Sequence, residues 1–370
     1  MSPVPPTSPD LLRKLHVELT TRCNLDCAMC QRHVWDEPEG EMAPETFRRL
    51  LEGLSALPGG KLLQLSGYGE PLAHPQVVEF VHAATAAGVE TELVTNGALL
   101  SRDLGMALIE AGLARLVLSV GCGDTVVGQS IATLRRLHRC ALGTDGAWPQ
   151  VAIHAVLRRS TVGVLGRLRA LAQAVHASTI SVSHLLPHTE EMAADAMYGP
   201  RLPTAGTSPD AEPNRWRPHV ILPALEWSPE EAQAVGGLLA GQPDLSLGRT
   251  RVHLGQSVCP FIAEGRAAVD WQGRLAPCLP LLRTHPLVTT RRRRIVRQWH
   301  VGNLTATPLA TLWEQADYVA FRTRVREFAF PPCPNCGDCE LVESNEADCY
   351  GNPFPTCGDC LYARGLVRCP

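Results

Sequence analysis

Short apolar runs alternate with helical patterns six times between residues 14 and 186, and this alternation limits the fold more than any other feature of the sequence. The runs are rich in aliphatic and β-branched residues, which favour strands. Strands that alternate with helices pair in parallel through right-handed crossovers. The runs begin at Lys14, Lys61, Val89, Ala114, Val151 and Thr179.

Six such units predict an α/β fold, a partial (β/α)6 TIM-type barrel, because a closed barrel of this type needs eight. Residues that commonly bound helices support the pattern. Pro44 and Pro75 fit first-turn positions, Ser101 fits an N-cap, and Gly88 and Gly112 fit the position after a helix end. A flat doubly wound sheet is the alternative fold.

Polar or glycine-rich motifs follow the first four predicted strands. Three cysteines follow the first strand, SGYGEP (66–71) the second and TNG (95–97) the third, while the fourth ends in Ser119. The carboxyl ends of parallel strands lie at one edge of the sheet, where such folds carry their chemistry. We therefore expect one site built from these four motifs.

The three cysteines of the first motif are Cys23, Cys27 and Cys30, in the segment TTRCNLDCAMCQR. Four thiolates close a [4Fe–4S] cluster, whereas three leave one iron open to a substrate. Structural zinc normally takes four ligands, and no suitable fourth lies near this loop. The motif favours an iron–sulfur cluster; zinc or inert thiols are the alternatives.

These motifs together resemble the radical S-adenosylmethionine superfamily, whose signature is CxxxCxxC after the first barrel strand. The resemblance implies that Cys23, Cys27 and Cys30 are the catalytic residues and hold a [4Fe–4S] cluster whose open iron binds S-adenosylmethionine. It implies reductive cleavage to methionine and a 5′-deoxyadenosyl radical, which abstracts hydrogen from a substrate. The expected cofactor-binding residues are Met29, Gly67, Gly69, Glu70, Thr95, Asn96 and Ser119.

The resemblance also implies roles for these residues. Gly67, Gly69 and Glu70 are expected at the amino group of the cofactor, and the TNG motif and Ser119 at its ribose and carboxylate. Two positions depart from the family pattern. Met29 replaces a commonly aromatic residue, and GYGEP replaces the commoner GGEP, so that Tyr68 either projects toward the site or is a core residue.

Nine of the fourteen cysteines fall in the C-terminal part of the chain. Together with Gly273 they resemble the SPASM extension of radical S-adenosylmethionine enzymes, which binds auxiliary [4Fe–4S] clusters. Two closed clusters would use eight of the nine thiolates. A zinc ribbon is the alternative, because CPNC and CGDC have zinc-ribbon spacing. The predicted metal ligands, taken as one set, are Cys259, Cys278, Cys333, Cys336, Cys339, Cys349, Cys357, Cys360 and Cys369.

The chain is expected to divide into four segments. Residues 1–13 form a flexible tail, residues 14–198 the partial barrel, residues 199–227 a proline-rich linker or loop, and residues 228–370 the cysteine-rich SPASM-like iron–sulfur domain. The N-terminus lacks the layout of a signal peptide, and no apolar run is long enough to span a membrane. We therefore expect a cytoplasmic protein. A net charge of −3 gives no reason to expect a nucleic acid or membrane partner.

Within the superfamily, the tail and the segment LLPHTEEM are most similar to maturases of metalloenzymes, including tungsten-cofactor oxidoreductases. This similarity implies a peptide, protein or cofactor-precursor substrate and a reductant such as ferredoxin or flavodoxin. A small-molecule radical enzyme, such as a sugar or nucleoside epimerase or dehydrogenase, would carry the same motifs. A noncatalytic electron carrier or scaffold is a third hypothesis, which the complete cofactor motifs oppose.

Overall fold

A computed structural model of the chain describes residues 11–59, 61–121, 124–141, 148–200, 223–225, 245–246, 259–288, 292–331, 333, 339–363, 366–367 and 369. Cys336, the N-terminal ten residues and most of the predicted linker lie outside these ranges.

The first six strands pair in parallel and in sequence order. The structure confirms all six predicted strands to within two residues at each end. They are β1 Lys14–Glu18, β2 Leu62–Ser66, β3 Glu90–Thr95, β4 Arg115–Val120, β5 Gln150–Leu157 and β6 Thr179–His184.

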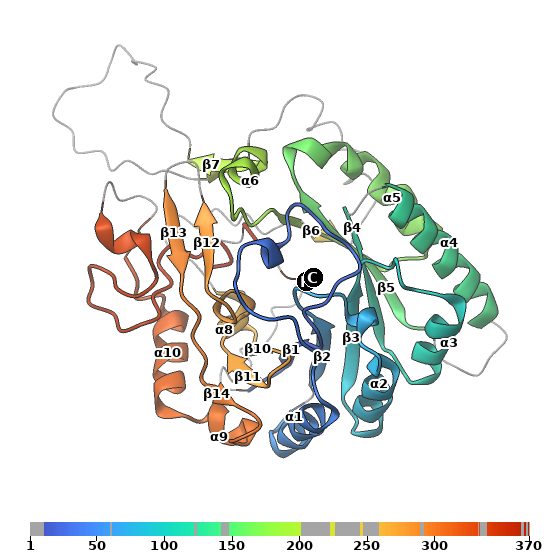
Figure 1. Ribbon diagram of the computed structural model, residues 1–370, viewed down its shortest axis with the longest axis horizontal. Helices are drawn as coiled ribbons and strands as arrows, with labels where there is room; N and C mark the ends of the chain where they lie inside the picture. The colour runs from blue at the N-terminus through green and yellow to red at the C-terminus, as the bar shows by residue number, and fades with distance from the viewer. Residues whose placement is uncertain are drawn as a thin grey trace, which may run out of the picture.

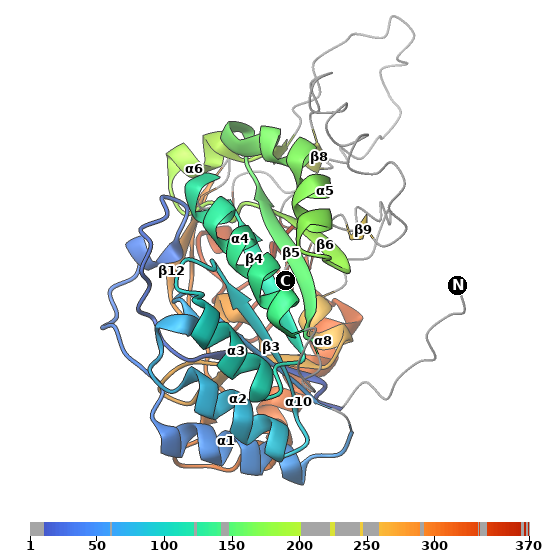
Figure 2. The same ribbon diagram turned by 90° about the vertical axis from the view of Figure 1, so that its right-hand side faces the viewer.

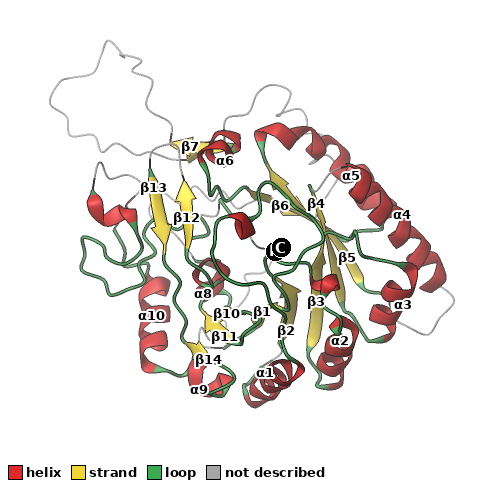
Figure 3. Ribbon diagram, viewed as in Figure 1, coloured by secondary structure: helices red, strands yellow, loops and turns green. Residues whose placement is uncertain are grey.

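Five helices connect these strands and line the outer side of the curved sheet (Figure 1). Their bounds are α1 Pro44–Ala56, α2 Val77–Ala86, α3 Arg102–Glu110, α4 Asp124–Ala141 and α5 Leu165–Ala174. Right-handed crossovers between successive strands place every helix on the same face, so the sheet curls into a partial barrel. A doubly wound sheet would carry helices on both faces. The side view and the secondary-structure view show one outer helical layer (Figures 2 and 3).

Most of the predicted helix boundaries are confirmed. Pro44 is the first residue of α1, and the Ser101 hydroxyl accepts a hydrogen bond from the Leu104 N–H at 3.1 Å. Gly88 and Gly112 adopt positive φ angles just after α2 and α3, where a side chain would be strained. The prediction for Pro75 is wrong, because Pro75 lies in the turn between the 3-10 helix η2 Pro71–Ala73 and α2.

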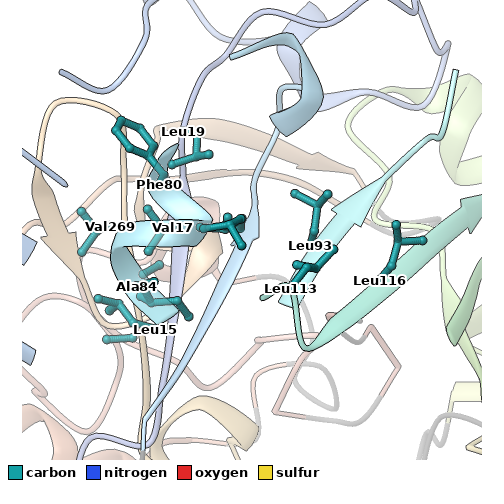
Figure 4. Close-up of a cluster of buried hydrophobic side chains, with 14 of the residues drawn as sticks. Leu15, Val17, Leu19, Phe80, Ala84, Leu93, Leu113, Leu116 and Val269 are labelled. Carbon is teal, nitrogen blue, oxygen red and sulfur yellow. The ribbon is translucent and has the colours of Figure 1, made fainter. Parts of the chain in front are cut away.

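The two faces of the sheet differ in polarity. On the outer face, Leu15, Val17 and Leu93 belong to one buried hydrophobic cluster with Phe80 and Ala84 of α2 (Figure 4). The inner face carries polar side chains in matching register, namely His16, Glu18, Gln64, Ser66, Ser119 and His154. The polar interior contrasts with the apolar interior of a closed barrel and leaves the inner face suited to bind a polar ligand.

The C-terminal part of the chain extends the same sheet. Strand β10 Arg266–Val269 pairs in parallel with β1, and β11 Arg274–Ala276 and β14 Gly302–Asn303 follow antiparallel. The described sheet has the order β14-β11-β10-β1-β2-β3-β4-β5-β6-β9, with β9 Leu245–Ser246 beside β6. The predicted boundary at residue 228 therefore divides the chain, but one continuous sheet contains strands from both sides of that boundary.

The remaining described elements surround this sheet. A hairpin of β12 His285–Val288 and β13 Arg293–Val296 stands beside the barrel (Figure 1). The other elements are η1 Gln31–His33, η3 Arg159–Val164, α6 Glu190–Asp195, β7 Tyr198–Pro200, β8 Pro223–Leu225, α8 Pro260–Ala263, η4 Leu279–Leu281, α9 Leu309–Trp313, α10 Ala316–Glu327 and η6 Glu340–Glu343. None of the helices within the described ranges combines the length and apolarity that crossing a bilayer requires.

Candidate active site

The cysteine loop, residues 20–41, leaves the carboxyl end of β1 and is fastened at its base. The Thr20 hydroxyl donates to the Gly40 carbonyl and the Gly40 N–H donates to the Thr21 hydroxyl, each at 2.9 Å. Within the loop, the Cys30 N–H donates to the Cys27 carbonyl at 2.8 Å, and η1 follows. The thiols of Cys23, Cys27 and Cys30 are all partly exposed, so one loop presents three sulfur ligands at the mouth of the barrel.

Gly69 brings the SGYGEP motif against this loop. A Cβ at Gly69 would lie 2.1 Å from the Thr20 carbonyl oxygen, so no other residue fits without a shift of the backbone. The next residue, Glu70, donates its N–H to the Arg22 carbonyl at 2.8 Å. Gly67 adopts a φ of +130°, and a Cβ there would meet the side chain of Glu18. The glycines thus place the second motif directly beside the first.

The Glu70 carboxylate joins the second motif to the third. It accepts hydrogen bonds from the Thr95 hydroxyl at 2.6 Å, the Asn96 N–H at 2.9 Å and the Leu72 N–H at 3.1 Å. Glu70 is 2% exposed; burial raises its pKa, and these hydrogen bonds oppose the rise. These hydrogen bonds position Thr95 and Asn96 around the carboxylate.

Asn96 carries the connection back to the cysteines. Its side-chain amide donates to the Asn24 side chain at 3.1 Å and lies 3.8 Å from the Cys23 sulfur. Ser119 lies one residue before the end of β4, on the inner face in register with His154, and Met29 is partly buried in the turn before Cys30. The structure therefore gathers the first three motifs by direct contacts and places Ser119 on the neighbouring strand.

A cation accompanies the three thiols. The Arg32 guanidinium donates to the Leu25 carbonyl at 2.8 Å. Burial lowers the pKa of Arg32, but a hydrogen bond to Cys30 and the charges of Cys30 and Cys23 outweigh it and raise the pKa. Three thiols from one loop, next to a fixed positive charge, have the donor chemistry of an iron–sulfur site, because thiolates are the ligands and a cation stabilises them.

A buried ion pair, which the sequence-based reasoning missed, lies under the cysteine loop. Arg283 donates to both carboxylate oxygens of Glu18, and their side chains are 1% and 0% exposed. Burial raises the pKa of Glu18 to about 7, against the lowering effect of Arg283. The sequence showed an acidic residue at the end of the strand KLHVE, and nothing local identified its partner 265 positions away.

Tyr68, one of the two departures from the family pattern, packs beside this ion pair. Its ring contacts Trp35 edge-on at 4.9 Å, and the Arg283 guanidinium lies over both rings. The Tyr68 hydroxyl donates to the Leu279 carbonyl at 3.2 Å. Tyr68 is thus partly buried and directed toward the C-terminal part of the chain.

Four of the tail cysteines influence one another electrostatically. Burial and then repulsion from Cys259, Cys360 and Cys357 raise the pKa of Cys278 well above its ordinary value. Burial, Cys360 and Cys259 do the same for Cys357. Cys278 and Cys259 lie at the starts of η4 and α8, and Cys357 and Cys360 bound one tight turn. These four thiols form one neighbourhood.

The other described tail cysteines are Cys333, Cys339, Cys349 and Cys369. Burial is the main cause that raises the pKa of Cys333, and Asp359 and Cys349 add to the rise. Cys333 and Cys349 therefore lie near each other. Cys339 precedes η6, and Cys336 lies outside the described residues. Cys369 lies near the start of β1 and near Cys360: burial raises its pKa to about 11, Cys360 adds to the rise, and Arg266 and Lys14 oppose it. Within the described ranges, no three His, Cys, Asp or Glu side chains converge on a single metal-ion position.

Comparison with known proteins identifies two families along the chain. Residues 17–139 match the radical SAM superfamily, and residues 259–340 match the SPASM iron–sulfur cluster-binding domain. The chain is 27% identical over 374 aligned positions to the tungsten-containing aldehyde ferredoxin oxidoreductase cofactor-modifying protein of Pyrococcus furiosus, covering 97% of each. It is 30% identical to the PqqA peptide cyclase of Rhodopseudomonas palustris over 46% of each chain.

Solved structures share the fold at low sequence identity. Streptococcus suis SuiB bound to S-adenosylmethionine superposes with a TM-score of 0.56 at 13% identity, over 92% of this chain and 73% of that one. The anSMEcpe structure with bound AdoMet and the Cp18Cys peptide gives 0.52 at 14% identity, over 95% of each chain.

The family matches, the contacts among the motifs and the fold all point to one superfamily. The cofactors are [4Fe–4S] clusters and S-adenosylmethionine. The chain belongs to the radical S-adenosylmethionine superfamily, and it is an enzyme of the subgroup with a C-terminal iron–sulfur-binding SPASM domain.

Proposed function

We propose that this enzyme is a maturase that modifies a metallocofactor precursor, a peptide or a partner protein by hydrogen abstraction. The observation that carries the proposal is similarity along 97% of the chain to a protein named for cofactor modification. A peptide cyclase matches over the barrel half and adds peptides to the substrate classes. The polar inner face of the sheet suits a hydrogen-bonding substrate.

The residues at the barrel mouth have separate tasks in this proposal. Cys23, Cys27 and Cys30 would hold the cluster, and the bound cluster and S-adenosylmethionine would supply the 5′-deoxyadenosyl radical. Arg32 stabilises the thiolates by its charge. Glu70 fixes Thr95 and Asn96, both of which would contact the cofactor, and the Asn96 amide faces the cysteine loop. Met29 would pack against the adenine ring and Ser119 would contact the cofactor from β4.

We divide the tail cysteines into two ligand groups. Cys259, Cys278, Cys357 and Cys360 would hold one auxiliary cluster, which the mutual electrostatic effects of their thiols support. Cys333 and Cys349, with Cys336 and Cys339, would hold the second, and Cys369 would remain a free thiol near Lys14. The reductant would be a low-potential protein such as ferredoxin or flavodoxin, and the location cytoplasmic.

The substrate class can be tested by isotope transfer. Cells are grown on deuterated medium, and their extract is separated into fractions. Each fraction is incubated with anaerobically reconstituted enzyme, reductant and S-adenosylmethionine. Deuterium in the released 5′-deoxyadenosine marks the fraction that contains the hydrogen donor. Transfer from a peptide, protein or metallocofactor-precursor fraction is the expected result. Transfer only from a sugar or nucleoside fraction contradicts a maturase. Alanine at Cys23, Cys27 and Cys30 is the control and abolishes transfer.

A further inference from the structure

Tyr68 touches both proposed cluster sites. Its main-chain carbonyl oxygen lies 4.0 Å from the sulfur of Cys30, a proposed ligand of the first cluster. Its side-chain hydroxyl donates to the carbonyl of Leu279, the residue that follows Cys278, at 3.2 Å. Cys278, a proposed ligand of the auxiliary cluster, is bonded directly to Leu279 in the chain. One residue therefore spans from one ligand loop to the other.

The surroundings hold Tyr68 in this position. Its N–H donates to the Glu18 carboxylate at 3.2 Å, and Glu18 is paired with the buried Arg283. Trp35 packs against its ring from the cysteine loop. Main chain, side chain and neighbours are thus all fixed, and a residue held this firmly can maintain two hydrogen-bond distances at once.

We propose that Tyr68 is the electron path between the cluster at Cys23, Cys27 and Cys30 and the auxiliary cluster at Cys278, an inference that rests on the proposed function. With both clusters bound, Tyr68 would carry one electron from the reduced auxiliary cluster, which would change from the 1+ to the 2+ state, to the first cluster, which would change from 2+ to 1+. No proton would move. A low-potential one-electron donor, such as dithionite or a reduced ferredoxin, supplies the electron initially.

The geometry favours this path on physical grounds. Electron tunnelling falls steeply with the length of the gaps that the electron crosses through space, and bonds or hydrogen bonds shorten those gaps. From Cys30 to Leu279 the path consists of one contact of 4.0 Å, the covalent frame of Tyr68 and one hydrogen bond of 3.2 Å. A glycine at position 68 would supply neither the ring nor the hydroxyl.

Two substitutions separate the parts of the path. Tyr68→Phe keeps the ring and removes the hydrogen bond to Leu279, and Tyr68→Leu removes the ring as well. Full-length protein is reconstituted anaerobically, reduced by a light pulse through a deazaflavin, and frozen at set times. The electron paramagnetic resonance signals of the two clusters are then followed, and S-adenosylmethionine identifies the first by shifting its signal. We expect electron exchange to slow severalfold in Tyr68→Phe and further in Tyr68→Leu.

Tyr350→Phe is the matched control, because Tyr350 is 65% exposed. Iron content and the midpoint potentials of both clusters are measured in every variant, and only variants at full iron loading are compared. Unchanged exchange rates in both Tyr68 variants at full loading would overturn the inference. Absence of iron at the Cys278 group in the unsubstituted protein would instead refute the ligand assignment, so the two failures are distinguishable.

Discussion

Gly69 is the residue at which the motifs of the site approach most closely. Its backbone lies against the carbonyls of Thr20 and Arg22, which a Cβ would meet at 2.1 and 2.7 Å. Thr20 and Arg22 immediately precede the first cysteine of the loop. Close backbone approach is therefore the reason for glycine at this position.

Replacing Gly69 by alanine is expected to displace the cysteine loop. The protein should lose about one third of its iron if it holds three clusters, because only the first cluster depends on this loop. Gly166→Ala is the matched control: a Cβ at Gly166 meets nothing within 4 Å, and alanine stabilises a helix by about 0.5–1 kcal/mol relative to glycine. Iron analysis measures the cluster content of the two variants, and thermal unfolding measures their stability. Full iron content in Gly69→Ala would show that the loop adapts.

A substitution at Glu70 tests whether its carboxylate is needed for cofactor binding. Glu70→Gln keeps the size of the side chain but replaces one acceptor oxygen by a donor, so that either the Thr95 hydroxyl or the Asn96 N–H loses its partner. Such a hydrogen bond to a charged group contributes about 1.5–3 kcal/mol, and because it positions residues that would contact the cofactor, its loss should weaken S-adenosylmethionine binding about tenfold. Calorimetric titration of fully loaded protein measures this affinity.

Exposed Glu79, in the first turn of α2, supplies the control variant Glu79→Gln, for which we expect unchanged affinity. Loss of iron from Glu70→Gln before any change in affinity would mean that Glu70 holds only the turn after β2. Unchanged affinity at full loading would remove Glu70 from the site altogether.

At the scale of elements, the polar inner face of the strands makes the fold sensitive to acid. His154 on β5 is 5% exposed, faces Ser181 on β6 at 3.3 Å, and burial lowers its pKa to about 4. The unfolded chain binds a proton at a pKa near 6.5. Because the unfolded state binds the proton first, stability falls as the pH drops from about 6.5 toward about 4.

His154→Gln should remove this contribution. Between a pH of about 7.5 and about 5.5, the free energy of unfolding should fall by roughly 1 kcal/mol less in the variant than in the unsubstituted protein. Denaturant unfolding at the two pH values measures the difference. His82→Gln, at an exposed position on α2, is the control. If the free energy of unfolding fell equally in His154→Gln and in the unsubstituted protein, burial of His154 would not be the cause of the acid sensitivity.

The elements also show what sequence reasoning could predict. Strands β1 to β6 and the Ser101 cap depend on residues close together in the chain, and local propensity identified them. The pairing of β10 with β1 joins positions about 250 residues apart, and no local pattern encodes such a contact. The motifs of the site are also local in the sequence, so they could be named in advance. The ion pair of Glu18 with Arg283 joins distant positions, and it was missed.

At the scale of the whole molecule, the continuous sheet determines how the auxiliary ligands can be tested. Truncation before Cys259 would remove β10 and leave the edge of β1 unpaired, so loss of iron in such a fragment could reflect misfolding. Point substitutions avoid this difficulty. The double variant Cys357→Ala, Cys360→Ala should lose about one third of the iron and retain S-adenosylmethionine cleavage or binding at the first cluster.

Cys140→Ala, on α4, is the control for removal of a thiol and should keep all of its iron. Iron and acid-labile sulfide are measured together with zinc. Retention of iron in the double variant contradicts the division of the tail cysteines, and zinc in place of iron in the unsubstituted protein restores the zinc-ribbon alternative.

The parallel pairing of β1 with β10 also governs the order of events during synthesis. The ribosome releases β10 only about 250 residues after β1. Until then β1 has a partner on one side alone, in β2, and Glu18 lacks the arginine that neutralises it. Long-range pairing of this kind is slow and leaves strand edges open to aggregation. Expression at a lower temperature or with additional chaperones should therefore increase the soluble yield more than changes to the exposed surface.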